Sequence, residues 1–147
     1  MKQARCFTAI ALSVCLLLIC ACGSRAGAAA VSLDYGESVL YSQEDMDAAI
    51  QLIQEEFAGW KGCELHSLRY TTYACNTQEN IQWMNALSKG QDLDITFTQC
   101  IAFESDFHSP KNSKDQGTWN LDMEYTDWQW WLARTDGGAW QLMTWGY

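Results

Sequence analysis

The residues that could do chemistry are few, and the densest group is the stretch "SDFHSP". Asp106, His108 and Ser109 are the residue types of a nucleophilic triad. The members of a triad must converge from separate elements to form a hydrogen-bond relay, which neighbours in one loop cannot easily do. We therefore expect no catalysis from this stretch.

Carboxylates are the other candidates for chemistry. Glu104, Asp106 and Asp127 could line a cavity, where paired carboxylates can supply a general base. Asp92 and Asp94 are most simply solvated near the start of a strand. No spacing of these residues requires a catalytic pair, so the sequence predicts that the protein is not an enzyme and keeps a small carboxylate enzyme as the alternative.

Three cysteines, Cys63, Cys75 and Cys100, follow the N-terminal region and allow at most one disulfide. Cys63 and Cys75 flank one predicted strand, whose length of about 3.3 Å per residue argues against their pairing. A bridge from Cys100 to either, or three free thiols, both stay open. His66 is expected at an exposed position. No Cys and His spacing indicates a metal, and we expect neither a metal nor a cofactor.

The first residues read as a targeting signal. Lys2 and Arg5 precede an apolar run over residues 7–21, and no acidic residue occurs there. The run is too short for a comfortable membrane span, which needs about 20 apolar residues. A basic start followed by a short apolar run is typical of a secretory signal peptide, here residues 1–21.

The end of this run resembles a bacterial lipobox. Ile19 and Ala21 supply the aliphatic and small residues that the pattern places before its cysteine, Cys22; Cys20 follows the bulky Ile19 and does not fit. The resemblance implies a diacylglyceryl group on Cys22 and a protein on the extracytoplasmic face of the cell membrane. Two acyl chains suffice for stable anchoring. The alternative is a secreted protein cleaved near residues 28–30.

Charge and length limit the remaining possibilities. The chain has 147 residues and a formal net charge of −9, which argues against nucleic-acid partners. Residues 22–38 are rich in Gly, Ala and Ser and predict a flexible tether. Residues 39–147 fit one domain that can bury a core without disulfides.

Two helices are expected in this domain. Ser42 and Asp45 resemble a capping box, and apolar residues recur at helical spacing from Met46 to Trp60. A strand is predicted over residues 65–73. Asn76 with Glu79 offers a second capping box before a short amphipathic helix that ends at Gly90.

The rest of the chain predicts three antiparallel strands. Apolar residues alternate over 95–103, a loop follows over 106–117, and strands over 119–134 and 139–147 flank a turn at 136–138. Helices set apart from a meander indicate an α+β fold, with one main helix packed on a curved antiparallel sheet.

Tryptophan is concentrated in the last two predicted strands. If Arg134 pairs with Trp140, both faces of the hairpin are apolar, whereas a sheet with one wet face should alternate. The second face must then be covered by the short helix, a partner subunit or a ligand. The candidate ligand or partner surface consists of Trp128, Trp130, Trp131, Trp140, Trp145 and Tyr147. Such apolar surfaces mark interaction sites when they are exposed, although the chain itself could bury both faces.

The segments "FESDFHS", "DWQWWLAR" and "AWQLMTWGY" resemble the closing segments of a family of small lipoproteins of Gram-positive bacteria. Members of this family carry one domain similar to the NTF2-like and cystatin-like folds. The resemblance covers about residues 38–147 and implies a curved sheet wrapped on a helix, with a cavity at its open end. It implies no activity, because such folds carry enzymes and binding modules alike.

The sequence as a whole predicts a lipid-anchored binding or interaction module. Its partner would be a small molecule, a glycan or a protein, and stacked tryptophans suit the sugar rings of a cell-wall glycan. The alternatives are the small carboxylate enzyme and a structural module that forms a homodimer through its aromatic face.

Overall fold

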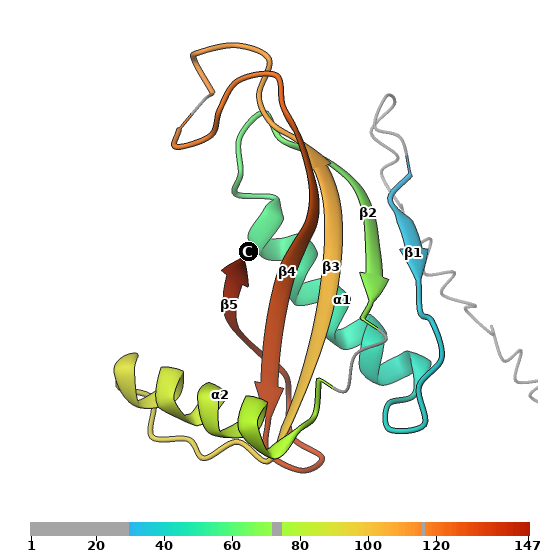
Figure 1. The fold of residues 1–147 in the computed structure, drawn as a ribbon, viewed down its shortest axis with the longest axis vertical. Helices are drawn as coiled ribbons and strands as arrows, with labels where there is room; N and C mark the ends of the chain where they lie inside the picture. The colour runs from blue at the N-terminus through green and yellow to red at the C-terminus, as the bar shows by residue number, and fades with distance from the viewer. Residues whose placement is uncertain (1–29, 72–74, 116) are drawn as a thin grey trace, which may run out of the picture.

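The computed structural model describes residues 30–71, 75–115 and 117–147. The signal peptide predicted for 1–21 and the lipidation site Cys22 lie outside these ranges. The described chain is an α+β domain with the element order β1 (Ser32–Asp34), α1 (Gln43–Phe57), β2 (Glu64–Tyr70), α2 (Gln78–Gly90), β3 (Gln99–His108), β4 (Glu124–Arg134) and β5 (Gln141–Gly146). Figure 1 shows α1 running along one side of the long strands and α2 near one end of the sheet.

The sheet is open and five-stranded, with the order β1-β2-β3-β4-β5. The strands from β2 to β5 pair antiparallel, whereas β1 pairs parallel with β2, and Leu33 lies opposite Leu68. The prediction of a wholly antiparallel sheet is therefore wrong at this edge. The segment predicted as a tether also contains a strand, because backbone pairing with the edge of β2 does not require an apolar pattern.

Helix α1 begins where the sequence predicted. The Ser42 side chain accepts from the Asp45 N–H, and Asp45 accepts from the Ser42 N–H, which completes a capping box. The face of α1 with Met46, Ile50 and Ile53 is buried against one face of the sheet, here called the inner face. This packing forms the main hydrophobic core.

Helix α2 covers part of the opposite, outer face of the sheet. Met84 of α2 packs with Phe97, Cys100, Ala133 and Met143 in a second buried cluster. The short helix therefore covers part of the second apolar face, which was one of the predicted alternatives. The predicted capping by Asn76 is wrong: Thr77 caps α2, because the Asn76 side chain instead accepts from the backbone N–H of Cys100.

Strand β3 is displaced toward the C-terminus relative to the prediction. Asn85 of α2 accepts from the Phe97 N–H and donates to the Phe97 carbonyl. These two bonds use the backbone groups that a strand neighbour would use, and β3 begins only at Gln99. At its other end β3 includes Asp106, Phe107 and His108, which were predicted to lie in the loop.

A register shift between Trp131 and Leu132 changes the faces of β5. Leu132 pairs with Leu142, which agrees with the predicted register, but Trp131 pairs with Thr144 and Trp130 with Trp145. One extra residue in a strand moves every later side chain to the other face. Trp145 and Tyr147 therefore lie on the inner face, and the prediction that they share a face with Trp131 is wrong.

The three cysteines of the described chain are free thiols, and Cys75 and Cys100 are buried. Burial raises the pKa of the Cys100 thiol to about 12, with a contribution from Cys75, and raises the pKa of the Cys63 thiol to about 11. Both thiols therefore stay protonated at neutral pH, and a protonated thiol is a poor nucleophile.

Candidate functional site

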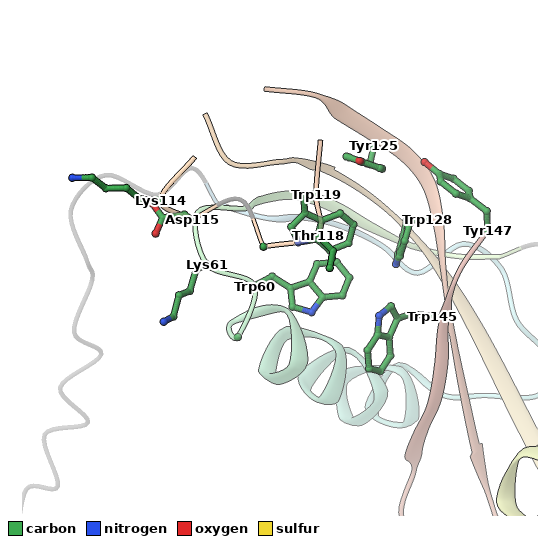
Figure 2. A pocket seen from close by; sticks show the side chains of 12 residues that line it. Trp60, Lys61, Lys114, Asp115, Thr118, Trp119, Tyr125, Trp128, Trp145 and Tyr147 are labelled. Carbon is green, nitrogen blue, oxygen red and sulfur yellow. The ribbon is translucent and has the colours of Figure 1, made fainter. Parts of the chain in front are cut away.

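A cleft of about 920 Å³ opens beside one end of the inner face. Its volume falls within the range of about 300–1,000 Å³ that is usual for small-ligand sites. We call it the aromatic cleft, because six aromatic side chains line it: Trp60, Trp119, Tyr125, Trp128, Trp145 and Tyr147. Figure 2 shows their rings arranged around a common space.

These six side chains come from separate parts of the chain. Trp60 lies in the turn after α1, and Trp119 lies in the connection between β3 and β4. Tyr125 and Trp128 project from β4, Trp145 from β5, and Tyr147 is the last residue. The cleft therefore exists only when the helix, the sheet and the β3–β4 connection are assembled.

Ring packing connects the cleft to the hydrophobic core. The Trp60 ring lies 4.8 Å from that of Trp119 and stacks at 5.1 Å on Trp130. Tyr125 stacks on Phe107 with the ring planes 2° apart. Because Trp130 and Phe107 are fully buried, the rings beneath the cleft are held by the core, and a site of this kind loses little conformational entropy on binding.

The β3–β4 connection is fastened at two places. The Ser109 hydroxyl donates to the Asn120 carbonyl at 2.6 Å and accepts from the Met123 N–H at 2.9 Å. Gly62 has a φ of +76°, and a Cβ atom there would meet the Asp115 Cβ at 2.8 Å. Only glycine combines this backbone conformation with so close an approach, which brings the connection against the turn that carries Trp60.

Polar groups lie at the edge of the aromatic cleft. Lys61, Lys114, Asp115 and Thr118 are part of its lining. The indole N–H of Trp128 is buried and has no hydrogen-bond acceptor in the part of the chain that the structure describes. A buried donor without a partner costs about 1–3 kcal/mol.

The structure brings three of the six predicted surface residues to the cleft, namely Trp128, Trp145 and Tyr147. Trp130 is fully buried beneath them, because its indole N–H donates to Ser105 at 2.9 Å and its ring packs under Trp60. Trp130 thus belongs to the core and not to a surface.

The other two predicted residues lie away from the cleft. Trp140 is buried: its indole N–H donates to the Asp45 carbonyl, and Arg134 lies 4.2 Å over its ring. Trp131 is on the outer face, 5.2 Å from Trp83 of α2. A single continuous aromatic surface is therefore not formed, because the bulge and the two helices divide the tryptophans.

Sequence reasoning missed Trp60, Trp119 and Tyr125. Trp60 was assigned to the apolar face of the first helix, and Trp119 and Tyr125 were treated as ordinary strand residues. The "WKG" stretch at residues 60–62 carried the available signal, since a tryptophan after the end of a helix and before a glycine is placed at a turn.

The carboxylates considered for catalysis lie together on the outer face, away from the aromatic cleft. Arg69 donates to Glu104 at 3.2 Å and to Asp106 at 3.0 Å, and it also pairs with Asp127. Burial alone would raise the pKa of Asp106, but hydrogen bonds from the Asp127 N–H, Ser67 and Arg69 outweigh it and hold this pKa below its ordinary value. Asp106 is therefore an ionised structural carboxylate, whereas a general base at neutral pH needs a raised pKa.

The residues of "SDFHSP" do not form a relay. The His108 ring contacts the Ser109 carbonyl at 2.8 Å through Nδ1, and its Nε2 lies 3.5 Å from Asp122. The Ser109 hydroxyl is used by the backbone of the β3–β4 connection, and Asp106 faces Arg69. Among the described residues, no three His, Cys, Asp or Glu side chains are grouped to hold a metal.

Replacing Asp106 by asparagine tests this assignment. We expect Asp106→Asn to lower the free energy of unfolding at pH 7 by about 1 kcal/mol, since charge-assisted bonds to a half-buried carboxylate are lost. Because the folded pKa is lowered, the stabilisation by Asp106 is complete above the ordinary value of 3.8 and is lost as the pH falls through the folded pKa. Urea unfolding at pH 7 and pH 3 should show the two proteins converging in acid.

Asp94→Asn is the control, because Asp94 is exposed and makes no ion pair with the residues that the structure describes. An Asp106→Asn protein that is more stable than the natural chain at pH 7 would contradict the assignment. That result would mean that the folded pKa of Asp106 is raised, as in a general base.

No protein-family model, curated protein or solved structure matches this chain. The structure itself therefore defines the class of this protein. It is an α+β domain with two helices and a five-stranded mixed open sheet, with an aromatic cleft beside one end of the inner face. Neither α1 nor α2 is long and apolar enough to cross a membrane.

Proposed function

We propose that this chain is a lipid-anchored extracytoplasmic binding module whose aromatic cleft holds a glycan without chemical turnover. The observation that carries the proposal is the convergence of six aromatic side chains from separate segments on one cleft of about 920 Å³. A sheet packed on one main helix supports the proposal of an NTF2-like or cystatin-like domain, for which the resemblance of the sequence implies a cavity at the open end of the sheet.

A sugar ring suits this lining better than a wholly apolar ligand does. A sugar ring has faces of C–H groups, which pack on aromatic rings, and a rim of hydroxyl groups, which need hydrogen-bond partners. The cleft offers both, because its aromatic faces are bordered by the polar side chains of Lys61, Asp115 and Thr118. A purely apolar ligand would leave those polar groups without compensation.

The indole N–H of Trp128 could donate a hydrogen bond to a hydroxyl group of the sugar. This donor lacks an acceptor, and the ring nearest to Trp128 among the cleft residues is Tyr147, at 5.0 Å. Tyr147 is 79% exposed, so its ring can move at little cost. A sugar oxygen that reaches this N–H would satisfy the donor.

The site of action follows from Cys22. A diacylglyceryl group there would hold the domain at the membrane surface, and the charge of −9 would keep it from anionic lipid. Ser32, where β1 starts, is the tenth residue after Cys22. A chain of this length spans at most about 35 Å, so the cleft would work within a short distance of the membrane.

Removing one wall of the cleft tests the proposal. We expect Trp145→Ala to weaken binding of chitotetraose, a neutral tetrasaccharide of a cell-wall type, about thirtyfold. This figure corresponds to about 2 kcal/mol for truncation of an aromatic anchor. Binding to the natural chain should shift the tryptophan fluorescence, and isothermal titration calorimetry should give the two dissociation constants.

Trp83→Ala is the matched control. Trp83 and Trp145 are both 41% exposed, but Trp83 lies on α2 and does not line the aromatic cleft. Its removal should leave the affinity within twofold. Equal losses in the two variants, or an unchanged affinity in Trp145→Ala, would show that the sugar does not bind in the cleft.

A further inference from the structure

The charged side chains at one end of the aromatic cleft indicate which kind of glycan it takes. Lys61 follows Trp60 in the turn after α1, and Lys114 lies in the β3–β4 connection. Figure 2 shows both lysines at the same end of the cleft with Asp115, and Tyr125 and Tyr147 toward the other end. The two lysine side chains extend away from the aromatic rings, so a ligand that spans the cleft would meet them at its outer end. The cleft therefore has an aromatic part and a cationic end.

Both lysines are exposed and lie outside the ion pairs of the described residues. Among the described residues, neither Lys61 nor Lys114 has a carboxylate within 4 Å, whereas Arg69 and Arg134 are both held in ion pairs. The whole chain has a net charge of −9. Two uncommitted cations beside one cleft of an acidic protein are thus available to a ligand.

We propose that the aromatic cleft selects an anionic glycan, whose carboxylate or phosphate substituent lies at the end formed by Lys61 and Lys114. This inference rests on the glycan binding proposed above and adds its charge. The sugar rings pack on the aromatic side chains, and the anionic group on a neighbouring ring is held by the two ammonium groups.

The opposite charge fits the cleft less well. Aromatic cages bind quaternary ammonium ions through cation–π contacts, but a cation here would approach two lysines beside Asp115. A neutral sugar would gain only ordinary hydrogen bonds from the lysines, whereas an anionic group would gain charge-assisted ones. An anionic group would meet Asp115 and also Glu56, which accepts from the Trp60 indole N–H at 3.4 Å. The two lysines offset these two carboxylates, and charges farther away than about 10 Å are screened in 0.1 M salt.

Three tetrasaccharides with one backbone provide the test. They are chitotetraose, the same chain with lactyl carboxylates on alternate rings, and the same chain with phosphates at the 6-positions. We expect the natural protein to bind at least one charged form about tenfold more tightly than chitotetraose, since two partly exposed ion pairs give about that factor. The stronger of the two charged forms identifies the carboxylate or the phosphate.

Substitution of the two lysines should remove this preference. In the double variant Lys61→Gln and Lys114→Gln, the charged and neutral tetrasaccharides should bind within twofold of each other. Asp115→Asn should increase the preference. The control is the double variant Lys89→Gln and Lys111→Gln, which changes the net charge equally at residues that do not line the cleft.

The outcomes separate this inference from the proposed function. If chitotetraose binds and the charged forms bind no more tightly, the inference is overturned and the proposed function stands. Loss of the preference in the Lys89 and Lys111 control would also overturn it, because the effect would then come from net charge alone. If none of the three tetrasaccharides binds, the proposed function fails and the inference fails with it.

Discussion

Replacing Trp130 with alanine is expected to lower the free energy of unfolding by about 3–5 kcal/mol, the usual cost of removing a large buried aromatic side chain. Trp130 is fully buried, and its ring packs against Phe57, Trp60 and Trp145. A domain of this size has a total stability of about 5–15 kcal/mol. The variant should therefore lose a large part of this stability and unfold at a much lower urea concentration.

Trp130→Phe separates the two contributions of this side chain. Phenylalanine fills much of the space but cannot donate to the Ser105 hydroxyl, which is itself buried. We expect a smaller loss, about 1–3 kcal/mol, of the kind seen when a buried polar group loses its partner. Urea unfolding followed by circular dichroism measures the stability of both variants. The urea concentration at the midpoint should be highest for the natural chain, lower for Trp130→Phe and lowest for Trp130→Ala.

Trp83→Ala again serves as the control, because its ring is 41% exposed and its removal should cost less than about 1 kcal/mol. A loss below that value for Trp130→Ala would contradict the packing described above. It would mean that the surface role predicted from the sequence for this residue is correct and that another residue fills the core.

The helices could be predicted because their signals are local. Ser42 and Asp45 cap α1 as their spacing indicated, and apolar residues at helical spacing mark its buried face. The end of α2 at Gly90 was predicted for the same reason. The antiparallel strands β3, β4 and β5 could be predicted from alternation and from the glycine turn, since both are readable within a few residues.

The faces of the last strand could not be predicted, because they depend on one extra residue. The pairing of Leu132 with Leu142 follows from the turn, but the register shifts between Leu132 and Trp131, where side chains pack on both faces of the sheet. Met143 enters the cluster under α2, while Trp145 turns to the inner face beside Trp130. A bulge of this kind leaves no local pattern in the sequence.

The aromatic cleft could be predicted only in part for a similar reason. Trp128, Trp145 and Tyr147 belong to the tryptophan-rich end of the chain, which composition alone brings to notice. Trp60 and Trp119 join them through long-range packing against Phe107 and against each other. Contacts between residues so far apart in sequence are set by the complete fold, and no spacing rule identifies them.

Replacing Cys22 with serine is expected to have the largest effect on location. The thioether requires the sulfur atom, so Cys22→Ser should leave the precursor without acyl chains. Each buried methylene contributes about 0.8 kcal/mol to membrane binding, and even one myristoyl chain gives only marginal attachment. Without any chain, the processed or secreted protein should be washed from membranes by carbonate, and the N-terminal peptide should show no lipid mass.

The neighbouring cysteine supplies the control for this prediction. Cys20→Ser keeps Ile19 and Ala21 at their places before Cys22, so its product should remain lipidated and membrane-bound. The prediction would be wrong if Cys22→Ser stayed attached after carbonate washing and Cys20→Ser were released. The lipid would then be on Cys20. If both variants stayed attached, the protein would be held at the membrane by something other than a lipid on Cys22. Neither helix of the described chain could be that anchor, because neither is long and apolar enough to cross a membrane.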